Sequence, residues 1–138
     1  MVQISSLAND LMRVGQSEAQ GFCFEVNPIP GEVEVLQVVV EDREELPIFI
    51  SASSEQILCI AFLFELKEVK EESVAEMNQA MLTSNISVPL SAFGILEGQY
   101  VIYGALSTQS SLEDVVHELE TLSNNTLEAI EAMRDFLK

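Results

Sequence analysis

The apolar residues of this chain change their spacing in blocks, and the order of the blocks constrains the fold more than any single motif. Leu7, Leu11 and Val14 recur at helical spacing, so we expect a short amphipathic helix over residues 4–15. The next four apolar segments have the two-residue period of strands or are apolar on both faces. They predict strands over residues 22–26, 33–40, 46–52 and 56–66.

Proline, glycine and charged residues separate these strands. The segment Asn27–Gly31, with two prolines and a glycine, is expected to end the first strand. The polar residues 16–20 and the acidic residues 41–45 are expected to form loops. Short turns join the last three strands, which predicts an antiparallel meander with the very apolar strand 56–66 in a central position. The strand over residues 33–40 ends apolar on both faces, so we expect something to cover its second face.

A second helix is predicted from Ser73 to about residues 83–85. Ser73 and Glu76 have the spacing of a capping box, in which each side chain accepts a hydrogen bond from the other residue's backbone. The apolar face of this helix is expected to hold Val74, Met77, Met81 and, at its margin, Leu82.

The methionines Met77, Met81 and Met133 fall on predicted helical stripes. Flexible thioethers suit both irregular cores and adaptable binding surfaces. Core filling is the more common role, and we favour it here.

A second strand pair follows the second helix. Residues 86–96 return to strand character, and the interruptions at Pro89 and Gly94 indicate an edge strand or a bulge. Residues 100–106 are expected to pair with this strand across a turn at residues 97–99.

The chain is expected to end in helix. Ser110 and Ser111 each have an acidic residue three positions on, so either could begin a capping box. Residues 123–126 are four poor helix formers. Residues 110–138 therefore form one long helix or two, the second capped by Asn125, and we favour one.

The order of elements is thus α-β-β-β-β-α-β-β-α. Runs of strands with helices between and after them predict an α+β fold, with helices packed on one antiparallel sheet. The length fits a single domain over residues 1–138.

The charge of the chain limits its partners. There are 23 acidic and 6 basic residues, a formal charge of −17, yet 48% of the residues are hydrophobic, so the chain is folded rather than disordered. Such a charge disfavours nucleic acid and anionic membranes and favours a basic or apolar protein partner. The longest apolar run, residues 57–64, is too short to cross a membrane, and the N-terminus lacks the pattern of a secretory signal. We therefore expect a soluble, cytoplasmic protein without direct membrane insertion.

No motif supports catalysis or a cofactor. The single histidine, His117, lies in the predicted last helix and lacks the partners that a general base or zinc site needs. Cys23 and Cys59 lie in apolar runs and are expected to pack as small hydrophobic residues. Glycine-rich phosphate loops and calcium-binding loops are absent, and the acids at 41–45 are expected to form a solvated loop. We expect no catalytic residues, no cofactor and no metal.

The segment Val88–Gly94, followed by a hairpin and a long acidic helix, is similar to the YjfI-like family of bacterial proteins. The element order, size and acidity also resemble the fold of type III secretion chaperones. That resemblance implies a dimer that holds extended segments of a partner. The YjfI-like resemblance implies an association with envelope stress, because its relatives are often encoded near phage-shock genes.

The leading hypothesis is a non-enzymatic, chaperone-like interaction module that forms a homodimer through a sheet edge or the long helix. The strand over residues 86–96 is expected to accept an extended peptide by strand addition. One alternative is a regulatory subunit of a membrane-stress complex. Another is an enzyme that uses His117, which requires His117 to line a cleft. No partner-binding residue is assigned from the sequence.

Overall fold

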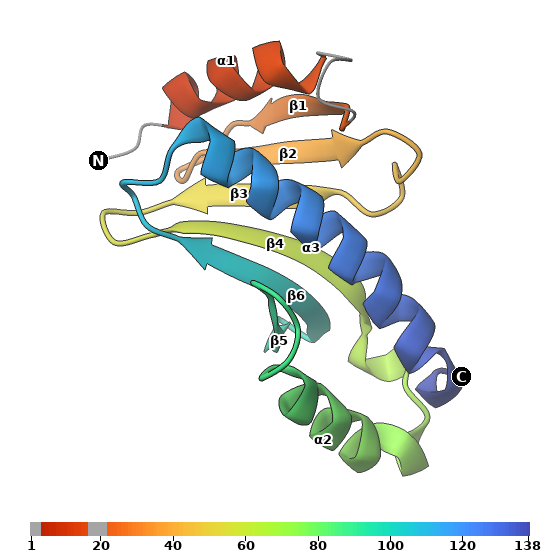
Figure 1. Cartoon of the computed structure of the whole chain (residues 1–138). Helices are drawn as coiled ribbons and strands as arrows, with labels where there is room; N and C mark the ends of the chain where they lie inside the picture. Colours follow the sequence, from red (N-terminus) through yellow and green to blue (C-terminus); the bar gives the residue numbers. More distant parts are fainter. Residues whose placement is uncertain (1–3, 17–21) are drawn as a thin grey trace.

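The computed structural model describes residues 4–16 and 22–138. Its centre is a six-stranded antiparallel sheet with strand order β1-β2-β3-β4-β6-β5, accompanied by three α-helices (Figure 1). The predicted fold class and element order are confirmed. The elements are α1 (Ile4–Gly15), β1 (Phe24–Ile29), β2 (Val35–Val40), β3 (Ile48–Ala52), β4 (Ile57–Glu65), α2 (Val74–Ser84), β5 (Ala92–Leu96), β6 (Gln99–Leu106) and α3 (Leu112–Met133).

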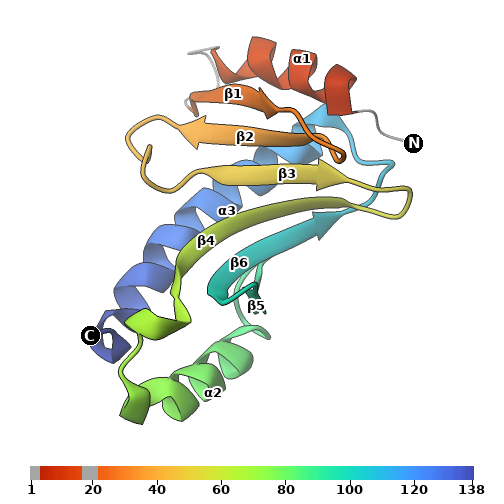
Figure 2. The same cartoon turned by 180° about the vertical axis from the view of Figure 1, so that it is seen from behind.

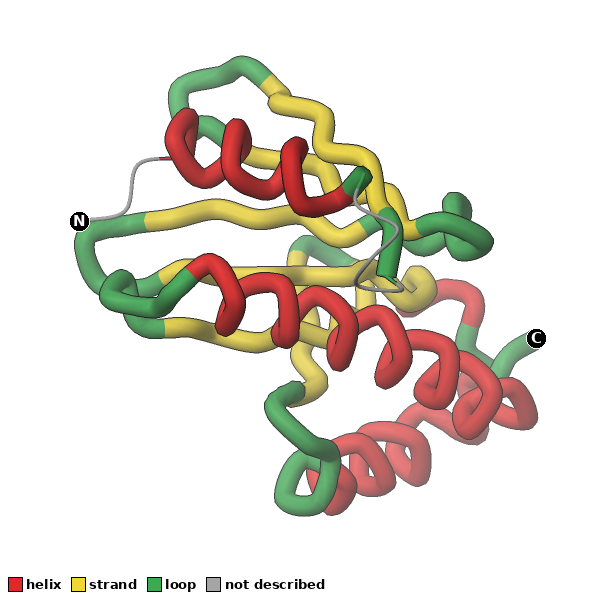
Figure 3. The backbone as a smooth tube through the Cα atoms, turned by 45° about the horizontal axis from the view of Figure 1, so that its top comes forward, coloured by secondary structure: helices red, strands yellow, loops and turns green. Residues whose placement is uncertain are grey.

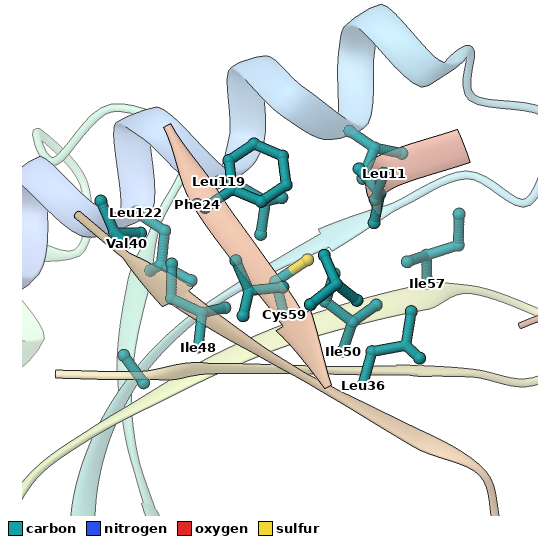
Figure 4. Close-up of a cluster of buried hydrophobic side chains, with 14 of the residues drawn as sticks. Leu11, Phe24, Leu36, Val40, Ile48, Ile50, Ile57, Cys59, Leu119 and Leu122 are labelled. Atoms are coloured by element: carbon teal, nitrogen blue, oxygen red, sulfur yellow. The ribbon is translucent and has the colours of Figure 1, made fainter. Parts of the chain in front are cut away.

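Helices α1 and α3 lie on the same face of the sheet and form the main core with it (Figures 1 and 3). Leu11 of α1 and Leu119 of α3 are fully buried and face inward-pointing residues of the strands, such as Ile50 (Figure 4). Burying a side chain of this size contributes about 1.5–3 kcal/mol. Cys59 lies in this cluster with no exposed surface, so its predicted role as a small hydrophobic residue is confirmed.

A second core joins α2 to the far end of the sheet and to the end of α3. It contains all three methionines singled out in the sequence, so core filling is confirmed for Met77, Met81 and Met133. The chain end closes this core, because the Lys70 N–H donates to the Phe136 carbonyl at 2.8 Å.

The first strand continues through Pro28, where the sequence predicted its end. Pro28 pairs with Leu36, and the ladder runs on to Ile29. β1 is an edge strand, so the N–H that proline lacks is not needed by a second neighbour.

The strand predicted over residues 86–96 is shorter than expected, because only Ala92–Leu96 form β5. The N–H groups of Ser87 and Val88 donate back to the Ser84 carbonyl, at 3.0 and 2.9 Å, and so extend the end of α2 as turns. Leu90 then adopts a left-handed conformation (φ 62°), which a strand cannot contain. The prediction that this segment lies at a sheet edge is confirmed for β5.

Helix α3 runs unbroken through residues 123–126, as favoured from the sequence. Two polar side chains of this segment form hydrogen bonds that leave the backbone hydrogen bonds of the helix intact. Thr126 Oγ1 donates to the Leu122 carbonyl at 2.7 Å, and Ser123 Oγ accepts from Arg43 at 2.9 Å. Ser111, rather than Ser110, begins the helix with a complete capping box.

The capping box predicted at Ser73 and Glu76 is wrong. A short 3-10 turn over Glu71–Ser73 precedes α2, and Ser73 itself has helical backbone angles. Its N–H already donates to the Lys70 carbonyl at 2.9 Å, and its side chain makes no capping bond.

The second face of the sheet is not covered by any described element. Figure 2 shows strands β1 to β4 from this side with no helix in front of them. The cover expected from the apolar end of β2 is therefore not supplied by residues 4–16 or 22–138. The predicted loop over residues 16–20 falls mostly outside the described residues. No described helix is long and apolar enough to span a membrane.

Candidate partner-binding surface

Large apolar side chains are exposed along α2, the turn after it and β5, and two of them, Leu82 and Ile95, line one cavity. Ile86 is 92% exposed and Leu82 is 70% exposed, which are high values for residues of this type. We call this patch the α2–β5 surface, defined by Leu82, Ile86, Leu90, Ile95 and Leu96. The sequence placed Leu82 at the margin of a buried face, and the structure places it in solvent.

The surface includes a free sheet edge, because β5 pairs with β6 alone among the strands that the structure describes. The Phe93 N–H donates to Asn85 Oδ1 at 2.7 Å, so this N–H points away from β6. In an antiparallel ladder the direction alternates with each residue, and the N–H and C=O of Ile95 therefore also face the free edge. Asn85 covers the start of the edge and leaves Ile95 available for pairing.

A cavity of about 310 Å³ lies between α2 and β5. Its walls include Met81, Phe93 and Tyr100, and its polar end is fixed by the Tyr100 hydroxyl, which donates to Asn78 Oδ1 at 2.6 Å. Burial raises the pKa of Tyr100, and the bond to Asn78 partly offsets this rise. The cavity is large enough for one or two apolar side chains of a bound segment.

His117 does not lie in a cleft. Its side chain is exposed on α3, and it lines none of five well-formed cavities among the described residues. The enzyme hypothesis required a cleft at His117, and the structure does not provide one.

The neighbouring residue, Glu118, is the buried acid that sequence reasoning missed. Only 2% of it is exposed, and its Oε1 has no hydrogen-bond partner among the described residues. Burial raises the pKa of Glu118, and His117 partly offsets this rise. Burial and the nearby Glu118 also raise the pKa of the Cys59 thiol to about 12, so this thiol is unreactive.

The acidic residues of the β2–β3 turn, unlike Glu118, have exposed side chains. The acids at 41–45 are exposed in the β2–β3 turn, as predicted. Among the residues that the structure describes, no three His, Cys, Asp or Glu side chains are placed to share a metal ion.

Comparison with known proteins places the chain in a family. The model described as "Uncharacterized protein conserved in bacteria (DUF2170)" matches residues 1–137. Uncharacterized protein YjfI of Escherichia coli K12 is 30% identical over 105 residues, which cover 73% of this chain and 77% of that protein.

Solved structures share the fold at low identity. A chain in the HopA1–SchA chaperone–effector complex is 15% identical with a TM-score of 0.59, covering 95% of this chain and 99% of that one. An uncharacterized protein from Methanothermobacter thermautotrophicus is 12% identical with a TM-score of 0.63, covering 95% and 99%. A chain of the ExoU–SpcU complex from the type III secretion system of Pseudomonas aeruginosa is 9% identical with a TM-score of 0.54, covering 94% and 96%. The predicted type III secretion chaperone-like fold is confirmed.

Proposed function

The chain belongs to the DUF2170 family, and we propose that it is a non-enzymatic, chaperone-like protein-binding module that forms a homodimer. The fold that it shares with a chain of a chaperone–effector complex supports the binding role. The proposed unit is a single domain of residues 1–138 that acts in the cytoplasm. The observation that carries the homodimer is the α2–β5 surface, where five exposed apolar residues flank a free sheet edge.

The second copy fits this surface through strand addition. The Ile95 groups of two copies can bond to one another in an antiparallel pair, so that two six-stranded sheets become continuous. Leu82 and Ile86 of each copy would then pack beside the new strand pair. The α2 residues that line the cavity beside this edge are neutral, such as Asn78 and Met81, so the strong overall charge opposes this contact only weakly.

A second candidate occupant is an extended segment of another protein at the same edge. The cavity between α2 and β5 favours it, because strand addition places alternate side chains against the flanking helix. The link to envelope stress and the role as a regulatory subunit stay predictions.

Light scattering over a range of concentrations tests the proposal. We expect the wild-type chain to have the mass of a dimer and the variants Ile95→Glu and Leu82→Glu to have the mass of a monomer. Val33→Glu is the matched control, because Val33 is 64% exposed but lies in the β1–β2 connection, away from α2 and β5. A monomeric wild type, or a dimer that survives both changes, would contradict the homodimer.

A further inference from the structure

Apolar residues of β3, β4 and β6 lie side by side on the uncovered face of the sheet. In the strand register Phe49 lies beside Ile60, and Ile60 lies beside Tyr103. The rings of Phe49 and Phe62 meet edge to face, with centroids 5.8 Å apart. We call this surface the open face, defined by Val39, Phe49, Leu58, Ile60, Phe62 and Tyr103, all of them half-buried.

The open face cannot be explained by packing within the described chain. The alternating neighbours of its residues, such as Ile48 and Cys59, point the other way and are fully buried under α1 and α3. Figure 2 shows the strands of the open face without a covering helix. A contiguous apolar surface of this kind on a soluble protein marks an interaction site.

Acidic side chains lie along one border of the open face, near β1 and the β2–β3 turn. Glu25 lies directly beside Val39 in the β1–β2 register. Glu25, Glu41 and Glu44 also line a cavity of about 400 Å³ that includes Val39. All three carboxylates are exposed.

The basic residues that border these strands are engaged elsewhere. Arg43, in the same turn as Glu44, reaches to α3, where it donates to Ser123 Oγ and Asn124 Oδ1 at 2.9 and 2.7 Å. Lys67, after β4, forms an ion pair with Glu65 at 3.1 Å. This border of the open face is therefore anionic, and a cationic partner complements it.

We propose that the open face binds a basic amphipathic α-helix of a partner protein. This inference names the partner chemistry of the protein-binding role proposed above and rests on it. The strands beneath the open face are already paired on both sides, so the face offers side chains and no free backbone groups. An occupant must therefore satisfy its own backbone hydrogen bonds, as a helix does and an isolated extended segment does not.

A second sheet is the other structure that could satisfy this condition, and the second copy of this chain is its obvious source. Charge argues against it. Each chain carries a formal charge of −17, and two open faces with acidic borders repel one another. The second copy is better placed at the α2–β5 surface.

The size of the sheet sets the length of the helix. Six strands spaced about 4.8 Å apart give a sheet roughly 24 Å wide, so a helix of about 16 residues spans the four strands of the open face and the two edge strands beside them. The probe is therefore a synthetic helical peptide of about this length, with leucines along one face and lysines on the other. A peptide with glutamates in place of the lysines and a scrambled leucine–lysine peptide serve as controls.

Binding is measured by fluorescence anisotropy, and the contact is mapped by NMR chemical-shift changes. We expect the leucine–lysine peptide to bind, the two control peptides not to bind, and the shift changes to lie on β2, β3 and β4. Glu25→Lys should weaken binding about tenfold, whereas Glu120→Lys, which makes the same change on the exposed side of α3, should weaken it far less. Phe62→Ser should abolish binding, with circular dichroism confirming the fold.

Several outcomes would overturn this inference. These are shift changes confined to α2 and β5, equal binding of the glutamate peptide, equal effects of Glu25→Lys and Glu120→Lys, or loss of the dimer in Phe62→Ser. The Ile95→Glu monomer should still bind the peptide. If the wild-type protein is a dimer but does not bind the peptide, only the open-face proposal is contradicted. If it binds the peptide but is a monomer, only the homodimer is contradicted.

Discussion

The carboxyl group of Glu118 lies over Gly104, in the space that a side chain at position 104 would occupy. This contact joins α3, which carries Glu118, to β6, which carries Gly104. The carboxyl group fits there because glycine has no side chain to occupy the space between the helix and the strand. The buried carboxyl group of Glu118 can therefore be accommodated only because position 104 is a glycine.

Replacing Gly104 with alanine should destabilise the fold. The new Cβ would overlap Glu118 Oε1, lie 2.8 Å from Glu118 Cδ and lie 3.0 Å from the Leu90 carbonyl oxygen. Overpacking of this kind costs about 1–3 kcal/mol of the free energy of unfolding, measured by urea denaturation. Gly31→Ala is the control, because its nearest contact is at an ordinary 3.6 Å.

A double-mutant cycle separates the clash from other effects of alanine. If Glu118 creates most of the cost, Gly104→Ala should be much less harmful in a Glu118→Ala background. An equal cost in both backgrounds would assign the strain to the Leu90 carbonyl instead.

Glu118 should make the stability depend on pH. Burial raises its folded-state pKa above the ordinary value of 4.5, so the folded protein binds more protons than the unfolded chain between these two values. The free energy of unfolding therefore falls as pH rises through this window. Glu118→Gln should raise the melting temperature at about pH 8, and the gain should shrink toward about pH 4.5.

Glu120→Gln is the matched control for this change. Glu120 lies on the same helix but is exposed. We expect no pH-dependent difference between this variant and the wild type. A Glu118→Gln gain of the same size at both pH values would show that charge is not its cause.

Ser111→Ala should destabilise the start of α3 by about 1 kcal/mol, because Ser111 Oγ accepts from the Asp114 N–H at 3.1 Å. Ser110→Ala tests the alternative capping box left open by the sequence and should have little effect. Thermal unfolding of the two variants distinguishes them, and equal losses would contradict the single cap.

The sequence predicted elements well where the hydrophobic period was long. The spacing of apolar residues along the chain predicted the ends of α1, the order of the six strands along the sequence and the continuity of α3. These features depend on neighbouring residues in the sequence and not on distant contacts. It failed at Pro28, because whether proline ends a strand depends on the neighbours of that strand in the sheet. It also failed at Ile86 to Ser91, because the bonds that hold this turn come from α2 and from a distant part of α3.

The candidate surfaces were less predictable than the fold. Leu82 and Ile60 are both apolar residues in regular elements, and spacing alone does not say that one faces solvent and the other an uncovered sheet face. The one usable signal was the apolar character of both faces at the end of β2, which predicted a cover that the described residues do not supply. Glu118 carried no signal, since acids are common along α3 and only the fold places Gly104 beneath it.

Asn125 should connect the stability of the fold to the α2–β5 surface. It is buried on α3 and donates through Nδ2 to the Pro89 carbonyl at 2.8 Å and to Ser91 Oγ at 3.0 Å. These bonds fix the turn that presents Ile86 and Leu90. Asn125→Ala leaves the Pro89 carbonyl without this donor, so we expect a loss of about 1–3 kcal/mol in urea denaturation.

The same variant should weaken self-association as well as the fold. If the turn is held by Asn125, the dimer of Asn125→Ala should dissociate at a higher protein concentration than the wild type under conditions where both are fully folded. Glu120→Ala, an exposed change on the same helix, should alter neither quantity. A destabilised but fully dimeric Asn125→Ala protein would show that the turn does not shape the interface, and that Leu82 and Ile95 suffice to form it.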